Sequence, residues 1–304
     1  MRKSRGNFKA EDRAVVANEH LFIFGPGYTA GYIGQRALSE GWTVSASYRD
    51  DTKVDGLRKA GYNAVALEPE ALKSALSDAT HILTSVAPGP GGDPVLPFLK
   101  SCAGQLNNLK WCGYLSSTNV YGDHGGAWVD EGTPASPNLD RGIRRVEAEN
   151  NWLALAESLG VPLHIFRLAG IYGPGRNAVR TMLDGRGKRI YKEGQLFSRI
   201  HVADIEETVW RAMNADLSSR VFNLADDAPA APQDIIEIAA KRLGMEVPPL
   251  IPLADADLSP MARSFYAESK RVRNMRIKEE LGITLKYPTF ESALEDLVAF
   301  ETKT

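Results

Sequence analysis

A short apolar run followed by closely spaced glycines is the feature that most limits how this chain can fold. Residues 21–24 read Leu-Phe-Ile-Phe, and residues 25–30 continue as Gly-Pro-Gly-Tyr-Thr-Ala, which fits the pattern G-x-G-x-x-G/A. Four successive apolar residues are typical of a strand buried on both faces. A helical pattern follows from about residue 29 to Gly41. This order predicts the phosphate-binding start of a βαβ unit, although a chance glycine-rich turn is the alternative.

Each small residue of this turn has a mechanical role in a dinucleotide-binding unit. Gly25 would allow the tight turn, Gly27 would let a pyrophosphate approach the backbone, and Ala30 would keep the helix close to the strand. The amino end of the helix would face the phosphates. We therefore expect the glycine turn, including Tyr28 and Thr29, to contact a bound cofactor.

Strand-like and helical stretches alternate through the next two hundred residues. Further strands are expected at 43–48, 63–67, 81–87, 111–116, 162–169 and 220–224, with helices notably at 94–108, 142–159 and 202–214. Alternation of this kind predicts an α/β fold with a Rossmann-like, doubly wound parallel sheet.

The pattern changes beyond Leu224, where two helical stretches (232–243 and 289–301) flank a Pro-rich segment. This predicts a smaller, mostly C-terminal substrate lobe over one edge of the sheet. The expected division is a polar tail at 1–18, a cofactor-binding domain at 19–173 and 198–226, and a substrate-binding lobe at 174–197 and 227–304.

Composition excludes several classes of function. The chain has 36 Lys+Arg against 38 Asp+Glu, a formal net charge of −2, whereas a protein that follows a nucleic-acid backbone should be strongly basic. No run approaches the ~20 apolar residues that span a bilayer. Cys102 and Cys112 are the only cysteines, and no spacing predicts a metal site. We expect two buried thiols, a cytoplasmic location, and no nucleic-acid or membrane partner.

The end of the second strand selects between the two nicotinamide dinucleotides. Residues 47–51 read Ser-Tyr-Arg-Asp-Asp. An acid at this place holds a ribose 2′-hydroxyl, whereas an arginine accommodates a 2′-phosphate. Arg49 comes first, so we favour NADP(H) over NAD(H). The alternative is a solvated Arg49 paired with Asp50 or Asp51.

Two further segments lie where strands of the predicted sheet end. Ser85-Val86-Ala87-Pro88 ends the fourth strand, where the strand order reverses and ligands bind. Leu168 lies near the end of the sixth strand. We expect both segments to contribute to the cofactor site.

Four strings in order carry a resemblance to a known family. Residues 116–122 (Ser-Ser-Thr-Asn-Val-Tyr-Gly), 167–176, 199–204 and 221–224 resemble the fifth strand, sixth strand, helix start and last strand of extended short-chain dehydrogenases/reductases. This is the superfamily of NAD-dependent epimerases and dehydratases. With the glycine turn, the resemblance covers about residues 20–302. It implies that Ser117 is the catalytic Ser/Thr and that a homodimer is possible.

The superfamily normally carries a Tyr-x-x-x-Lys pair, and this sequence lacks it. The chain therefore resembles an atypical branch of the superfamily. Alignment on the following helix places Arg141 at the tyrosine and Arg145 at the lysine. Arg145 remains cationic and can donate to ribose hydroxyls, whereas Arg141 cannot act as an acid/base but can stabilise an alkoxide. The alternative is a solvated, charged helix face shared with Glu147 and Glu149.

Other polar residues have a structural role or a choice between a structural and a functional role. Tyr121 accompanies the usual pair in the superfamily and is expected to be structural. His124 is either a general acid or a surface histidine, and His201 is expected to anchor the helix that starts at Val202. Arg176 and Asn177 either clamp a hydroxylated or anionic substrate or cap the next helix.

The function predicted from these features is NAD(P)-dependent oxidation, reduction or epimerisation of a carbonyl or sugar-like small molecule. A protein that binds NADP as a sensor without turnover is the alternative, because the usual tyrosine and lysine are missing. A third possibility is another Rossmann class, such as a methyltransferase.

Overall fold

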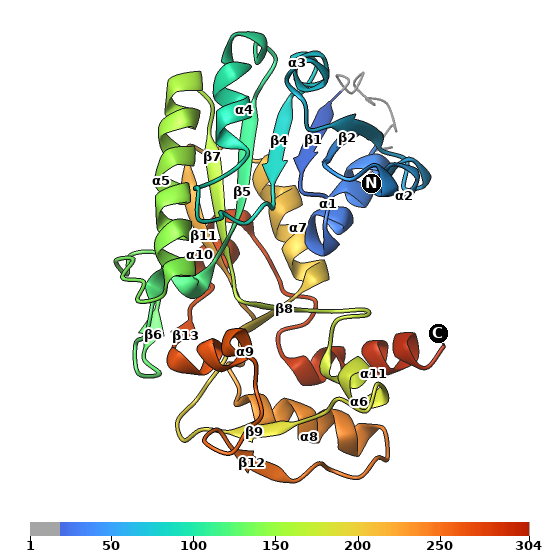
Figure 1. Cartoon of the computed structure of the whole chain (residues 1–304), viewed down its shortest axis with the longest axis vertical. Coiled ribbons are helices and arrows are strands. Elements are labelled where there is room, and N and C mark those ends of the chain that lie inside the picture. The colour runs from blue at the N-terminus through green and yellow to red at the C-terminus, as the bar shows by residue number, and fades with distance from the viewer. Residues whose placement is uncertain (1–18, 304) are drawn as a thin grey trace, which may run out of the picture.

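A seven-stranded parallel sheet forms the centre of the protein. The computed structural model describes residues 19–303, so the predicted tail at 1–18 lies outside the described residues. The strands occur in the order β11-β7-β5-β4-β1-β2-β3 (Figure 1). Their bounds are β1 His20–Phe24, β2 Thr43–Tyr48, β3 Asn63–Ala66, β4 His81–Thr84, β5 Trp111–Ser117, β7 Leu163–Leu168 and β11 Arg220–Leu224. The predicted α/β class and doubly wound sheet are confirmed.

Helices cover both faces of the sheet because its strands are apolar on both sides. One face carries α1 (Tyr28–Ser39), α2 (Val54–Lys59), α7 (Val202–Met213) and α10 (Met275–Leu281), and the other carries α3 (Pro69–Ser77), α4 (Leu96–Ser101) and α5 (Asp140–Leu159). Two separate apolar cores result. The first contains Leu21 and Ile23 of β1, and the second contains Phe22 and Phe24, as the alternation of a strand requires.

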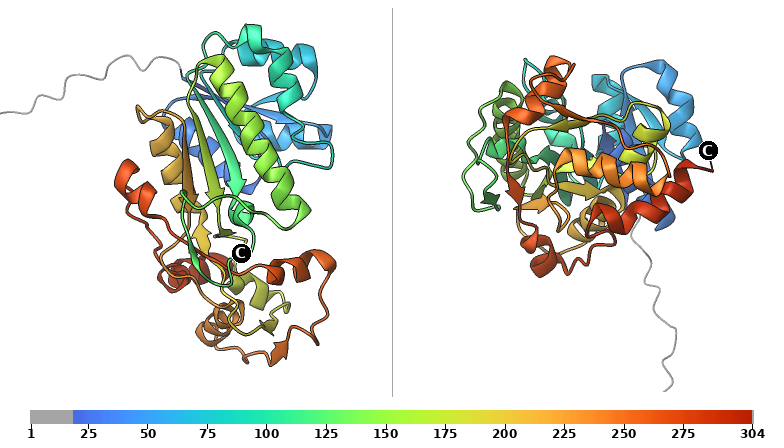
Figure 2. Two further views of the ribbon diagram at one scale, coloured as in Figure 1. Left: turned by 90° about the vertical axis from the view of Figure 1, so that its left-hand side faces the viewer. Right: turned by 90° about the horizontal axis from the view of Figure 1, so that it is seen from below.

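A smaller lobe lies beyond the carboxyl ends of the strands (Figure 2). It contains α6 (Ala178–Leu183), α8 (Pro232–Arg242), α9 (Pro260–Ser264) and α11 (Phe290–Glu301), with strand β9 (Arg189–Tyr191) paired to β12 (Leu250–Pro252). Helices α6, α8 and α11 share a third core that includes Val179, Ala239 and Leu297.

The structure corrects the predicted extent of the smaller lobe. Residues 271–285 were expected in it, yet β13 (Arg271–Val272) pairs with β6 (Trp128–Val129), and Ile277 and Leu281 pack in the first core of the large domain. The amphipathic pattern of α10 shows that one face is buried but does not show against which core. The chain therefore returns to the large domain before ending in the smaller lobe.

Two predicted elements are shorter than expected. The helix expected at 94–108 is α4 followed by a 3₁₀ turn at Ala103–Gln105, and the strand expected at 81–87 ends at Thr84. Ser85–Pro88 instead form the wall of the ligand cavities described below. The short strands β8 (Gly170–Tyr172) and β10 (Arg199–His201), which pair with each other, were not predicted as strands.

The remaining structural expectations concern cysteines, metals and membranes. Cys102 and Cys112 are both buried and free, as predicted. Within residues 19–303, no group of three or more His, Cys, Asp or Glu side chains is placed to hold a metal ion. In the same part of the chain, no helix combines the length and apolar character needed to cross a membrane.

Candidate functional site

A cavity of about 1200 Å³ opens above the carboxyl ends of β1 and β2. Its walls include the glycine turn, the end of β2 and the start of the loop after β4, where the sheet order reverses between β1 and β4. Gly27 is the N-cap of α1, so the unpaired backbone N–H groups of the first helical turn face this region. We refer to this space as the first cavity.

Gly25 is required by the geometry of the turn. Its φ is +72°, and a Cβ there would lie 2.8 Å from Val86 Cγ2 and 3.3 Å from Ser85 Oγ. Ser85 Oγ also donates a 2.5 Å hydrogen bond to the Gly25 carbonyl. The glycine turn and the β4 loop are thus in direct contact, which leaves the exposed backbone of the turn facing the cavity.

The charges in the first cavity come from the region after β2. Arg49 and Lys53 line it, and neither side chain forms an ion pair with a described residue. Asp50 also lines it, but its Oδ1 accepts hydrogen bonds from Thr52 N (2.9 Å) and Thr52 Oγ1 (2.7 Å), which lower its pKa. The alternative pairing of Arg49 with Asp50 or Asp51 is absent between these residues. A glycine cradle, a helix amino end and two unpaired cations fit a dinucleotide phosphate.

A second cavity of about 900 Å³ lies between the large domain and the smaller lobe. Gly27, Tyr28 and Ser85 line both cavities, so the two spaces meet at the glycine turn. Many of the predicted site residues line the second one: Tyr28, Thr29, Ser85, Ala87, Pro88, Ser117, Arg141, Arg145, Leu168, Arg176 and Asn177. Val86 lines only the first cavity, and Ala30 is buried in the core beside the turn.

Ser117 and Arg145 are brought to the same wall of the second cavity. Ser117 ends β5, and its Oγ accepts a 3.3 Å hydrogen bond from Asn119 N, so its hydroxyl proton is available to a ligand. Arg145 of α5 donates from Nη1 to Tyr114 Oη (3.0 Å) and to the Leu115 carbonyl (3.2 Å). Burial raises the pKa of Tyr114, which keeps this phenol neutral beside the guanidinium.

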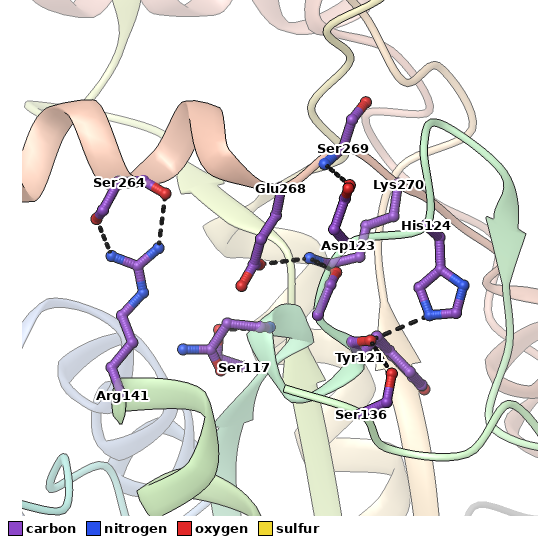
Figure 3. A network of polar contacts seen from close by, with 12 residues as sticks. Ser117, Tyr121, Asp123, His124, Ser136, Arg141, Ser264, Glu268, Ser269 and Lys270 are labelled. Atoms are coloured by element: carbon purple, nitrogen blue, oxygen red, sulfur yellow. Dashed lines mark hydrogen bonds and ion pairs between the residues drawn. The ribbon is translucent and has the colours of Figure 1, made fainter. Parts of the chain in front are cut away.

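Arg141 crosses from the large domain to the smaller lobe (Figure 3). Its Nη1 donates to Ser264 Oγ (2.5 Å), its Nη2 lies 3.4 Å from the Ser264 carbonyl, and its guanidinium lies 4.5 Å from the centre of the Phe265 ring. Arg141 therefore ties α5 to α9. It still leaves N–H groups for a ligand, because a guanidinium has five donors.

The helix face that carries these arginines is not the solvated face considered as the alternative. Glu149 is only 5% exposed and forms a buried ion pair with Arg167 of β7 at 2.7 Å. Ser116 donates a 2.5 Å hydrogen bond to the same carboxylate. This network fixes α5 against β5 and β7, which orients Arg141 and Arg145 toward the second cavity.

Several predicted candidates instead support the fold. Tyr121 is fully buried and donates to Asn223 Oδ1 at 2.7 Å, as expected of a structural residue. His124 donates from Nε2 to the Tyr121 carbonyl at 3.0 Å and lines neither cavity (Figure 3). Asn177 caps α6 by accepting from Arg180 N, and His201 caps α7 by accepting from Ala203 N, as expected.

Three charged residues of the second cavity were not predicted: Arg199, Glu268 and Lys270. Lys270 Nζ lies 2.8 Å from Glu268 Oε2 and donates to the Gly122 carbonyl at 2.7 Å (Figure 3). Residues 268 and 270 come from a segment that has no motif, about 150 positions after Ser117. Of these three residues, only Arg199 belongs to a segment that the sequence resemblance included, residues 199–204. That resemblance did not identify Arg199 as a site residue.

Comparison with known proteins gives relatives by sequence and solved structures with the same fold. No family model matches the sequence. A conserved protein of unknown function from Silicibacter pomeroyi DSS is 46% identical, with a TM-score of 0.86 over 92% of this chain and 98% of that one. Protein YeeZ of Escherichia coli K12 is 26% identical over 278 residues, which are 88% of this chain and 95% of YeeZ.

More distant solved structures share the fold. The UDP-glucuronic acid 4-epimerase of Bacillus cereus, in complex with UDP-glucuronic acid and NAD, is 16% identical with a TM-score of 0.74 and covers 93% of this chain and 99% of its own. MoeE5, in complex with UDP-glucose and NAD, is 18% identical with a TM-score of 0.73 over the same shares. The fold of this chain is the fold of these enzymes, and by its 46% identity over nearly its whole length the chain belongs to the same family as the Silicibacter pomeroyi protein.

Proposed function

We propose that the protein is an NAD(P)-dependent oxidoreductase or epimerase-like enzyme that acts on a carbonyl or sugar-like small molecule. The observation that carries this proposal is the junction of the two cavities at Gly27, Tyr28 and Ser85. A dinucleotide whose phosphates lie on the glycine turn would extend from the first cavity into the second. The reactive end of the cofactor would then meet Ser117 and the arginines of α5.

The residues of the second cavity can perform the non-redox parts of such a reaction. A bound nicotinamide cofactor would supply or accept the hydride. Ser117 can donate a hydrogen bond to a substrate oxygen, and Arg145 can donate to ribose hydroxyls while remaining cationic. Arg141 can stabilise negative charge on that oxygen through the N–H groups not used by Ser264.

The fold comparison supports the same proposal. The Bacillus cereus epimerase and MoeE5 are both described in complex with NAD and a UDP-sugar. Their chains align with this one over 93% of its length, including both lobes. A shared two-lobe arrangement is what a cofactor domain and a substrate lobe require.

We further propose that NADP(H) is preferred over NAD(H). Arg49 and Lys53 line the first cavity without an ionic partner among the described residues, and a 2′-phosphate would supply one. One of the two carboxylate oxygens of Asp50, Oδ1, is already engaged by Thr52. The charges at the end of β2 therefore favour the phosphorylated dinucleotide.

The test is thermal unfolding of the wild type and of Arg49→Asp with NADPH, NADP, NADH and NAD. A ligand at 100 times its Kd stabilises the folded state by about 2.7 kcal/mol, so the phosphorylated pair should raise the Tm by several degrees. Arg49→Asp should abolish most of that shift. Arg58→Asp, a charge change of the same size on α2 outside the cavity lining, is the matched control. Absence of a shift with all four dinucleotides would refute the proposal.

A second candidate function is an NADP-binding sensor without turnover. It rests on Arg141, which the sequence resemblance aligns with an acid/base tyrosine and which donates to Ser264 of the smaller lobe. An arginine cannot donate a proton to a substrate as a tyrosine does, but here it connects the two lobes. Such a contact suits a protein in which cofactor binding changes the position of one lobe relative to the other. Steady NADPH oxidation with any member of a panel of carbonyl compounds would refute it.

A further inference from the structure

The second cavity has a large excess of positive charge. Five cationic side chains line it, and one carboxylate lines it: Arg141, Arg145, Arg176, Arg199 and Lys270 against Glu268. The formal balance of the lining is therefore five minus one, or +4. These residues come from α5, from the loop after β8, from β10 and from the segment before β13, so the charge surrounds the cavity.

Among residues 19–303, Lys270 is the only one of these five cations that forms an ion pair. Lys270 forms its ion pair with Glu268. The four guanidinium groups have no carboxylate oxygen within 4.0 Å among residues 19–303. Asp226 contacts Arg199 through the backbone: the Asp226 N–H donates to the Arg199 carbonyl. The Asp226 carboxylate forms no ion pair with the Arg199 guanidinium.

Arg199 shows the electrostatic cost of this arrangement most clearly. Its Nη1 donates to the Phe197 and Ala230 carbonyls, at 3.0 and 3.1 Å. Burial lowers its pKa, and the carboxylate of Asp226 opposes that shift only in part. An arginine remains charged in a protein, so an anion that enters the cavity would relieve the unfavourable burial.

Two residues that line the same cavity carry buried acceptors without a hydrogen-bond partner among the described residues. Glu268 is 7% exposed, and its Oε1 has no hydrogen-bond partner among the described residues, whereas its Oε2 is held by Lys270. Asn119 Oδ1, which belongs to another lining residue, is also buried and unpartnered. Buried acceptors of this kind require a donor, and a ligand hydroxyl is a donor that a carboxylate and an amide can both use.

We infer that the second cavity binds a small hydroxylated anion, a sugar acid or a sugar phosphate, with its negative group among the guanidinium groups and its hydroxyls on Glu268 and Asn119. This inference rests on the proposed function, because it names the substrate class of the same site. Cations that surround the space suit a compact anion.

The experiment measures binding of four defined probes to the full chain saturated with NADPH, at constant ionic strength. The probes are glucuronate, glucose 6-phosphate, neutral glucose and inorganic phosphate, with UDP as the nucleotide comparison, and calorimetry gives each Kd. The two hexose anions distinguish a carboxylate from a phosphate as the negative group. We expect at least one of them to bind about tenfold or more tightly than glucose, phosphate or UDP.

Variants connect this binding to the guanidinium groups. Arg199→Gln and Arg141→Gln should each weaken binding of the preferred hexose anion about tenfold or more. Arg141 is less buried, so its variant provides the test if Arg199→Gln does not fold. Arg273→Gln removes the same charge from an exposed residue that lines neither cavity, and it should leave the Kd unchanged.

Three results would overturn the inference: equal affinity for glucose and the hexose anions, equal or tighter binding of UDP or of phosphate alone, or full affinity in Arg141→Gln. The NADPH shift is measured separately on the same protein. If NADPH binds and no hexose anion does, the substrate class is wrong while the cofactor proposal stands. If a hexose anion binds without any response to NADPH, the cofactor proposal fails alone.

Discussion

The two cavities are built in different ways, although they meet at the same three residues. The first is formed by a continuous turn, the end of β2 and the loop after β4, and the backbone provides much of what a ligand would contact. The second collects side chains from α5, β10 and the smaller lobe, and four of them are guanidinium groups without a carboxylate partner in the described chain. One site is made by local backbone geometry, and the other by packing between distant segments.

The two cavities therefore depend on different parts of the structure. The glycine turn needs only a few residues in sequence order to place a helix amino end toward a phosphate. The second cavity depends on how α5 and the smaller lobe lie against the sheet. We therefore expect changes in packing to affect mainly the second cavity and changes in the turn to affect mainly the first.

The largest effect is expected from the ion pair beneath the second cavity. Glu149→Ala would leave the buried Arg167 guanidinium without its carboxylate and remove the acceptor of Ser116. Loss of one partner of a buried pair costs about 3–5 kcal/mol, and urea unfolding measures it. Glu147→Ala, on an exposed position of the same helix, should change stability little. Equal effects of the two variants would show that Glu149 does not hold α5 in place.

Acid should weaken both parts of the molecule through buried histidines. Burial lowers the pKa of His81, the first residue of β4, and of His201, at the start of α7, to about 4 each. Unfolded histidine has a pKa near 6.5, so between about 6.5 and 4 the unfolded chain binds more protons and stability falls as the pH falls. At pH 5 each histidine should cost about 2 kcal/mol relative to pH 7.

His201→Asn tests this assignment at the junction of the lobes. Asparagine can replace the N-cap hydrogen bond of His201 to Ala203 N but does not titrate. The variant should lose about 2 kcal/mol less than the wild type between pH 7 and pH 5 in urea unfolding. An unchanged pH dependence would mean that His201 is not a source of the acid sensitivity.

The smallest change in stability is expected in the glycine turn, where the effect on binding is local. Gly25→Ala forces a side chain onto a backbone with φ of +72° and places its Cβ against Val86, at a cost of about 1–2 kcal/mol. The turn must shift, so the NADPH-induced rise in Tm should fall sharply. Gly104→Ala has open space and no positive φ, and should leave that rise intact. Retention of the full rise in Gly25→Ala would remove the turn from the cofactor site.

The elements that were predicted well are those whose pattern is complete within a few residues. The run at 21–24, the turn at 25–30 and the alternating strands gave the large domain and its order of helices. The helix at 94–108 was overextended because Leu106 is apolar and buried although the chain there is no longer helical. The alternative of a solvated, charged helix face included Glu149, because its buried partner, Arg167, lies on a strand and not on the same helix.

The sequence alone determined the α/β sheet, the glycine turn with its φ-positive Gly25, and the position of Ser117 at the end of β5. These features depend on apolar periodicity and on residues that are neighbours in the chain. Only the tertiary structure decided that residues 271–285 return to the large domain, that Arg141 reaches Ser264, and that Glu268 and Lys270 face the same cavity as Ser117. The physical reason is that burial and charge pairing depend on distances in space. When two residues are more than a hundred positions apart, the local sequence around each one carries no information about that distance.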